Sequence, residues 1–187
     1  MKKASFIISF LWINSAFGQS GFVERALNKA REKKYEEAII LVDSALVIDS
    51  NNSDIYTIKA EFLWMSKNYY QAAISYQKAL VLDEDHSFLH GAYLMVGILY
   101  EKAGMRTHAQ TYYLKAIYFF ETKKRKDDKF FEVSNKEDYA VSLKLSGNDQ
   151  EFERLLDEPF YKSLLQRYIG KNRSEVLEIF FKPFSGD

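Results

Sequence analysis

The chain has 187 residues, 26 basic and 26 acidic side chains, and no cysteine. A chain of this length can bury about two-thirds of its unfolded surface, as one domain or as a short array of repeats. The balanced charge argues against a nucleic-acid-binding protein, which needs a basic face to displace counterions from phosphates, and the lack of cysteine excludes disulfides and thiol catalysis.

The first segment, residues 1–18, is predicted to be a secretory signal peptide. It has two lysines at its start, an apolar run over residues 6–17, and small side chains at Ala16 and Gly18. The run is shorter than the ~20 residues of a transmembrane helix, and the alternative is a retained amphipathic or anchoring helix. Cleavage removes two lysines and no acid, which leaves 24 basic and 26 acidic residues and a net charge of −2. We expect an exported bacterial protein, periplasmic or secreted, without membrane insertion after cleavage.

Two stretches of the chain align without a gap at a spacing of 34 residues. They are residues 34–49, KYEEAIILVDSALVID, and residues 68–83, NYYQAAISYQKALVLD. The matching alanines are Ala38 with Ala72 and Ala45 with Ala79. A third copy, with Ala109 and Ala116, follows 37 residues later because three residues are inserted in the connection. A fixed period of this size predicts a stacked array of helix hairpins.

This pattern resembles the tetratricopeptide repeat family, whose unit is a 34-residue helix–turn–helix. The resemblance implies an all-α, right-handed solenoid with units at residues 19–52, 53–86 and 90–123. The alanines would let neighbouring helices approach closely, and large aromatic side chains such as Tyr69 and Tyr76 would fill the space between them.

After Ile117 the period fades, and the remaining segments are predicted to close the array. The run 123–129, KKRKDDK, is expected to be solvated. Ser134–Glu137 is predicted to be a capping box that starts a helix ending at Gly147. That helix and the following one form a degenerate fourth pair. Pro159 then opens a helix that ends at Gly170, and Asn172 and Glu175 frame the last helix. Residues 134–187 are interpreted as this pair and a helical C-terminal cap.

The resemblance also implies a concave groove, lined by defined positions on the first helix of each unit. Carried onto this sequence, these positions predict a partner-binding set of eleven residues, Tyr93 being added as an aromatic anchor. They are Val23, Leu27, Arg31, Asp54, Thr57, Glu61, Trp64, Tyr93, Leu94, Ile98 and Glu101. The chain's own C-terminal helices could fill the same groove instead.

No catalytic, cofactor-binding or metal-binding motif is present in the sequence. His86 and His90 lie near two aspartates, but we place them in the connection between repeats, with no third ligand at a motif spacing. We therefore expect a protein without catalysis, cofactor or metal. Acid pairs such as Asp127–Asp128 leave a hydrolase that uses surface acids as a remote alternative.

The expected function is a scaffold or assembly factor that binds a peptide or helix of a partner protein in the groove. Trp64 and Tyr93 are the expected anchors, since aromatic side chains dominate interface energetics. The alternative is a periplasmic immunity-type protein that inhibits a single toxic enzyme. Neither interpretation involves nucleic acid.

Overall fold

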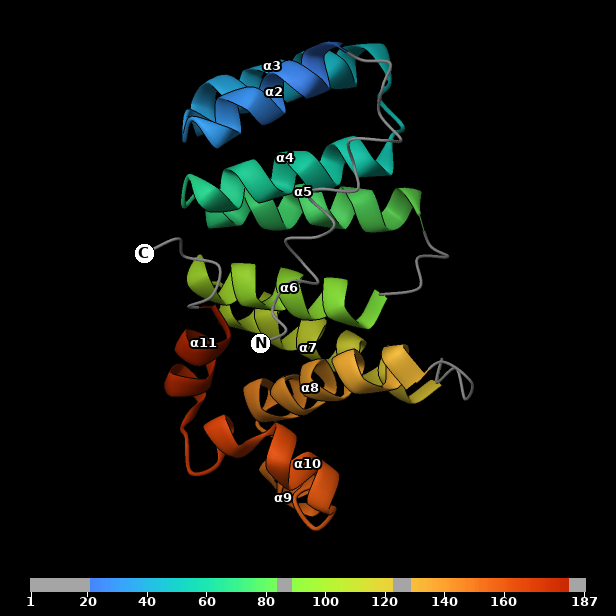
Figure 1. Cartoon of the computed structure of the whole chain (residues 1–187), viewed down its shortest axis with the longest axis vertical. Helices are drawn as coiled ribbons and strands as arrows, with labels where there is room; N and C mark the ends of the chain where they lie inside the picture. The colour runs from blue at the N-terminus through green and yellow to red at the C-terminus, as the bar shows by residue number, and fades with distance from the viewer. Residues whose placement is uncertain (1–20, 84–88, 123–128, 182–187) are drawn as a thin grey trace. The chain divides into compact units, whose positions relative to one another are not determined.

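A computed structural model describes residues 21–83, 89–122 and 129–181, and every regular element in these ranges is a helix (Figure 1). The chain divides into two compact units, of which unit 1 ends at Asp83 and unit 2 begins at the next residue. The predicted signal peptide, His86 and most of the KKRKDDK run lie outside the described residues. None of the described helices combines the length and the hydrophobicity needed to cross a membrane.

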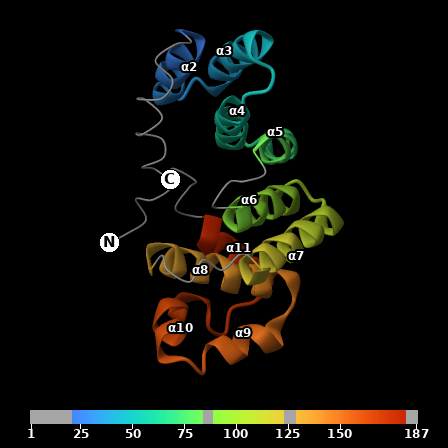
Figure 2. The same ribbon diagram turned by 90° about the vertical axis from the view of Figure 1, so that its right-hand side faces the viewer.

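Unit 1 consists of two helix hairpins. Its helices are α2 (Gly21–Arg31), α3 (Tyr35–Ile48), α4 (Ser53–Met65) and α5 (Tyr69–Leu82). Each helix packs on the next one along the chain. The first helices of the hairpins, α2 and α4, lie on one side of the unit, and the second helices, α3 and α5, lie on the other (Figure 2).

Unit 2 begins with a hairpin of the same kind, continues into the long helix α8 and ends in four short helices. Its elements are α6 (Leu89–Lys102), α7 (Arg106–Thr122), α8 (Lys129–Ser146), α9 (Asp149–Leu155), α10 (Pro159–Leu164), the 3-10 helix η1 (Gln166–Tyr168) and α11 (Arg173–Phe181). Helix α6 pairs with α7, α7 with α8, and α8 with α9, while α11 contacts α8 and η1.

The repeated alanines occupy equivalent positions, as predicted. Ala38, Ala72 and Ala109 are each the fourth residue of a second helix, and none of the three is exposed to solvent. The eleventh residue of each of these helices is also a buried alanine. A methyl group at these points allows close helix packing, so the spacing of small residues sets the hairpin geometry.

In the described part of the chain, the turns of α2–α3, α4–α5, α6–α7 and α8–α9 are the same. The residues in the left-handed conformation are Lys33 (φ 60°), Lys67 (φ 64°), Gly104 (φ 78°) and Gly147 (φ 82°). The backbone N–H of the next residue donates to a carbonyl five residues back, as Asn68 does to Leu63 (2.8 Å). Equivalent bonds of 2.8–2.9 Å follow Lys33, Gly104 and Gly147, so α8 and α9 form a fourth hairpin despite their weak sequence similarity to the others.

The α6–α7 hairpin also depends on a close approach at Gly97. A Cβ atom there would lie 2.6 Å and 2.7 Å from two ring carbons of Tyr113 on α7. The Tyr113 side chain is fully buried, so its ring has no room to move aside. Glycine at position 97 therefore fixes the place of Tyr113 against α6.

Three local predictions for unit 2 are wrong. Helix α8 begins at Lys129, so Ser134 lies inside the helix and not at its start. His90 belongs to α6 and not to the connection before it. Helix α10 ends at Leu164 and is followed by η1, well before Gly170. The tighter 3-10 turn places Leu165 and Tyr168, three residues apart, on one face, and both are buried.

Two predicted helix starts are confirmed. Pro159 occupies the first turn of α10. At the start of α11, the Glu175 N–H donates to Asn172 Oδ1 (3.1 Å), and the Asn172 N–H donates to Glu175 Oε2 (2.9 Å). This reciprocal pair satisfies two N–H groups that a helix end otherwise leaves without partners.

Candidate protein-interaction surfaces

Within unit 1, the residues predicted to line a groove all lie on the first helices, but most of them are buried. Val23 and Leu27 belong to the hydrophobic core of the unit. Arg31 and Asp54 are exposed, and Thr57 is half-buried with its hydroxyl donating to the Ser53 carbonyl (3.0 Å). Of these five residues, only Arg31, Asp54 and Thr57 therefore offer side-chain surface to a partner.

Glu61 and Trp64, on α4, are buried as well. Glu61 Oε2 has no hydrogen-bond partner in the described part of the chain, and neither has the hydroxyl of Tyr76 on α5. Burial raises the pKa of the Glu61 carboxyl to about 7. Burial, together with the nearby Glu61, raises the pKa of Tyr76 well above its usual range. Burial without a hydrogen-bond partner destabilises the charged form of an acid, so this carboxyl holds its proton up to near-neutral pH.

In unit 2, the four predicted groove residues lie on α6. Leu94 and Ile98 are buried. Tyr93 is half-buried, and its ring stacks on Phe119 at 5.0 Å between centroids. The Lys115 amine lies 5.7 Å from the Tyr93 ring centroid, on α7. Tyr93 is thus part of the packing between α6 and α7.

Glu101, the fourth residue of this set, is bound by the chain's own helix α11. Arg173 Nε donates to Glu101 Oε1 (2.7 Å) and Arg173 Nη2 donates to Oε2 (2.9 Å). The Tyr113 hydroxyl also donates to Oε2 (2.6 Å). The Arg173 guanidinium lies over the Tyr113 ring, 5.5 Å from its centroid, and donates through Nη1 to the Leu145 carbonyl.

A second ion pair connects the same two helices. Lys102 Nζ, next to Glu101 on α6, lies 2.6 Å from Glu178 Oε1 on α11. Between Arg173 and Glu178 in the sequence of α11, Val176 and Leu177 are buried. At Glu101, therefore, the chain's own C-terminal helix α11 occupies a position that was predicted to bind a partner. Occupation by the C-terminal helices was the alternative given for the groove.

The second helices carry a surface that the sequence interpretation missed. In unit 1, large apolar side chains on α3 and α5 are exposed at equivalent positions, two residues after each buried alanine. The exposed fractions are 65% for Ile40, 86% for Val47, 39% for Ile74 and 67% for Val81. We call these four residues the outer stripe. Since Ile40 and Val47, like Ile74 and Val81, are seven residues apart, each pair lies on one face of its helix.

The signal for this surface is present in the sequence. Ile40 and Ile74 are 34 residues apart, as are Val47 and Val81. The repeat frame that locates the buried alanines also shows that these positions point away from the helix contacts. A large apolar residue at a solvent-facing repeat position is the pattern that predicts such a stripe.

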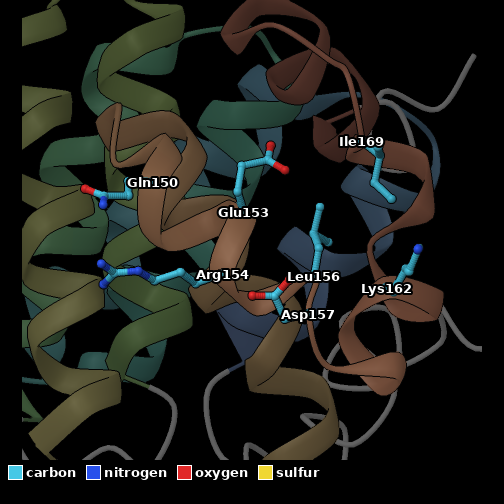
Figure 3. A pocket seen from close by; sticks show the side chains of 7 residues that line it. All are labelled: Gln150, Glu153, Arg154, Leu156, Asp157, Lys162 and Ile169. Carbon is cyan, nitrogen blue, oxygen red and sulfur yellow. The ribbon is translucent and has the colours of Figure 1, made fainter.

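A shallow pocket of about 770 Å³ lies in unit 2, beside α9 and α10. Figure 3 shows Glu153, Leu156 and Ile169 pointing toward the space between α9 and the chain after α10, with Gln150 and Arg154 on the other side of α9. The lining mixes both charges with apolar side chains, and it contains no pair of nucleophile and base. Within the described ranges, no three His, Asp or Glu side chains come together as metal ligands would.

The helices define an all-α fold of the tetratricopeptide-like kind, built from hairpins that share one turn and one pattern of buried alanines. Among solved structures, the chain is similar to the crystal structure of MamA, a tetratricopeptide-like helical repeat protein, with a TM-score of 0.53 and 17% identity. The match covers 78% of this chain and 75% of that one. No family model and no curated protein matches the sequence, so the likeness shows the fold alone.

Proposed function

We propose that this protein is an exported, non-catalytic scaffold that binds a partner protein. The fold supports the proposal, since arrays of helix hairpins present extended surfaces to partners. The observation that carries it is the outer stripe of unit 1, where Val47 is 86% and Val81 67% exposed. Isolated apolar residues on a surface are normal, but the recurrence of these at the same repeat positions favours an interaction surface.

The partner surface that fits the outer stripe is an apolar helix face. Each pair of stripe residues is seven residues apart along its helix, so its side chains follow the helix axis over two turns. Acidic side chains flank the stripe on α3, where Glu36 is exposed and Asp43 is exposed and paired with Lys59 of α4 (2.6 Å). We therefore expect an amphipathic segment with basic residues beside its apolar face.

The predicted groove on the first helices is the competing surface. In unit 1 it offers Arg31, Asp54 and Thr57 to a partner, and all three are polar. A partner held there would depend on charge and hydrogen bonding, whereas a partner held by the outer stripe would depend on apolar burial. Substitutions on the two faces therefore distinguish the two binding modes.

The test uses photo-crosslinking followed by affinity measurement. The protein is produced in a bacterial host with a photoreactive amino acid at position 47 or 81, or at position 54 as the matched control. The crosslinked partner is identified by mass spectrometry and then purified. We expect crosslinks from positions 47 and 81, and at least a tenfold loss of affinity for Val47→Asp combined with Val81→Asp. The intact mass of the periplasmic protein should correspond to a chain that begins at Gln19.

The matched control variant is Asp54→Ala combined with Thr57→Ala, which should bind the partner as the wild type does. Circular dichroism must show the same helicity for every variant, because both stripe residues are exposed and their substitution leaves the core intact. Crosslinks from position 54 alone, with loss of affinity only in the Asp54 and Thr57 variant, would transfer the binding site to the groove. Absence of any crosslinked protein would contradict the scaffold function.

A further inference from the structure

The part of unit 2 around Glu101 is built to receive a guanidinium group. The acceptors and the aromatic face come from three different helices: the Glu101 carboxylate from α6, the Tyr113 ring from α7 and the Leu145 carbonyl from α8. Only the donor, Arg173, comes from α11. Paired hydrogen bonds between a guanidinium and a carboxylate are the strong and geometrically specific kind.

We propose that this position is a binding site for an arginine-bearing helical segment of a partner protein, and that α11 occupies it in cis. The site exists before any ligand binds, because none of its receiving groups belongs to α11. Tyr113 is fully buried against Gly97, and its hydroxyl holds Glu101 Oε2 at 2.6 Å. The carboxylate is therefore already oriented for a fork of two N–H groups.

The neighbouring Lys102 adds a second point of recognition. It pairs with Glu178 at 2.6 Å, and the Glu178 side chain is 70% exposed, so this pair lies at the rim of the contact. Helix α6 thus presents an acid and a base side by side, Glu101 and Lys102. Helix α11 supplies their partners, Arg173 for the acid and Glu178, five residues later, for the base. Val176 and Leu177, which lie between these two residues of α11 in the sequence, are buried. A partner segment that fits carries the same order of charges around an apolar pair.

Helix α11 has the properties of a ligand that can be displaced. It is nine residues long, and helices of this length are marginal on their own. It reaches α6 through two side-chain pairs, and it follows Gly170, whose φ of 70° turns the chain. Its attachment gives it a high effective concentration at the site. A partner segment in trans therefore binds weakly while α11 is in place and more tightly once α11 is detached.

The probe is a fluorescein-labelled synthetic peptide with the sequence of residues 169–181, titrated with the full chain and followed by fluorescence anisotropy. Arg173→Ala removes the guanidinium of the cis ligand and leaves the receiving groups unchanged. We expect this variant to bind the peptide at least tenfold more tightly than the wild type does. Adding Glu101→Gln to the same chain should remove the gain, and so should a peptide in which the arginine is replaced by alanine.

A second variant covers the case in which Arg173→Ala lowers the stability of unit 2. Glu178→Lys changes an exposed side chain, abolishes its pairing with Lys102 and leaves the Glu101 network in place, so it should raise peptide affinity by a few fold. Circular dichroism establishes that each chain retains its helicity. Peptide binding that is unchanged in both variants, or that survives Glu101→Gln, overturns the proposal.

This site does not rest on the outer stripe of unit 1, and the two proposals can fail separately. The peptide titration reports only on unit 2. Val47→Asp combined with Val81→Asp should leave the peptide affinity of the Arg173→Ala chain unchanged. If those two substitutions weaken peptide binding, the peptide is held by the apolar stripe and the assignment to Glu101 is wrong.

Discussion

The carboxyl group of Glu61 lies in the interior beside α5, and its Oε2 atom has no hydrogen-bond partner among the described residues. Burial raises the pKa of this group from 4.5 to about 7. A group whose folded-state pKa lies above its unfolded value links stability to pH. Below pH 4.5 both states hold the proton. As the pH rises toward 7, only the unfolded state releases it, so the free energy of unfolding falls.

We expect Glu61→Gln to be more stable than the wild type at pH 8, by up to about 3 kcal/mol, since one pKa unit corresponds to about 1.4 kcal/mol. At pH 4 the two proteins should differ little, because both the buried acid and its amide replacement are then neutral. Urea unfolding followed by circular dichroism at pH 4, 6 and 8 measures this difference.

Asp138 on α8 contributes an effect of the same sign, because burial raises the pKa of its carboxyl to about 7 as well. Glu61→Gln should therefore remove only part of the decline in stability with pH, and Asp138→Asn serves as the parallel variant. A stability profile of Glu61→Gln that runs parallel to the wild type from pH 4 to 8 would show that Glu61 is ionised in the folded protein.

At the scale of side chains, the sequence predicts on which helix a residue lies better than it predicts whether that residue is buried and what it contacts. The repeat frame correctly places Val23, Leu94 and Glu101 on first helices. It does not predict that Val23 and Leu94 are buried, because burial depends on which elements pack around each helix. The contact between Arg173 and Glu101 joins residues 72 apart in the chain. No local pattern in the sequence encodes such a pairing.

The backbone strain energy of the hairpin turn depends on which residue occupies its left-handed position. Lys67 adopts a φ of 64° there, and Gly104 takes the same place in the next hairpin with a φ of 78°. A side chain with a Cβ atom is strained in this conformation by about 1–2 kcal/mol, whereas glycine is not. A Cβ at Gly104 would meet no atom within 4 Å, so backbone strain would be its only local cost.

We therefore expect opposite results from reciprocal substitutions. Lys67→Gly should raise the free energy of unfolding by up to about 1 kcal/mol, and Gly104→Ala should lower it by about 1–2 kcal/mol. Lys78→Gly is the matched control, since Lys78 is exposed in the middle of α5, where glycine destabilises a helix by about 1 kcal/mol. Urea unfolding of the three variants checks the signs. If Lys67→Gly and Lys78→Gly are equally destabilising, the turn conformation is not the source of strain.

Prediction at the level of elements succeeds where one local rule determines the result. Alanine spacing locates α3, α5 and α7, and the reciprocal hydrogen bonds of Asn172 and Glu175 start α11 as expected. The capping box expected at Ser134 fails because α8 extends upstream to Lys129. A short capping motif is also compatible with a helix interior, so it cannot by itself set where a helix begins.

For the molecule as a whole, the division into two compact units predicts how distant substitutions combine. Ala38 in unit 1 and Ala140 in unit 2 are both completely buried. Replacing either with leucine should overpack its core and cost about 1–3 kcal/mol. We expect the double variant to lose the sum of the two single losses to within about 0.5 kcal/mol, because sites without shared partners behave independently. Urea unfolding curves of the single and double variants measure this.

The contrasting pair is Gly97→Ala with Tyr113→Leu, whose side chains would touch within unit 2. Leucine at position 113 relieves the clash that alanine at position 97 creates, so this pair should deviate from additivity by at least about 0.5 kcal/mol. A deviation of similar size for Ala38→Leu with Ala140→Leu would mean that the two positions are energetically coupled, contrary to this expectation.

The shared hairpin turn also makes the chain extensible. A copy of residues 35–68 begins at the first residue of a second helix, α3, and ends just after a hairpin turn. If this copy is inserted after Asn68, each of its two junctions again joins the end of a hairpin turn to the first residue of a second helix. Every junction then keeps the hydrogen bonds that already follow Lys33 and Lys67. Duplication of the DNA that encodes this segment therefore lengthens unit 1 by one hairpin and needs no new type of turn. Each added hairpin also adds one isoleucine and one valine to the outer stripe.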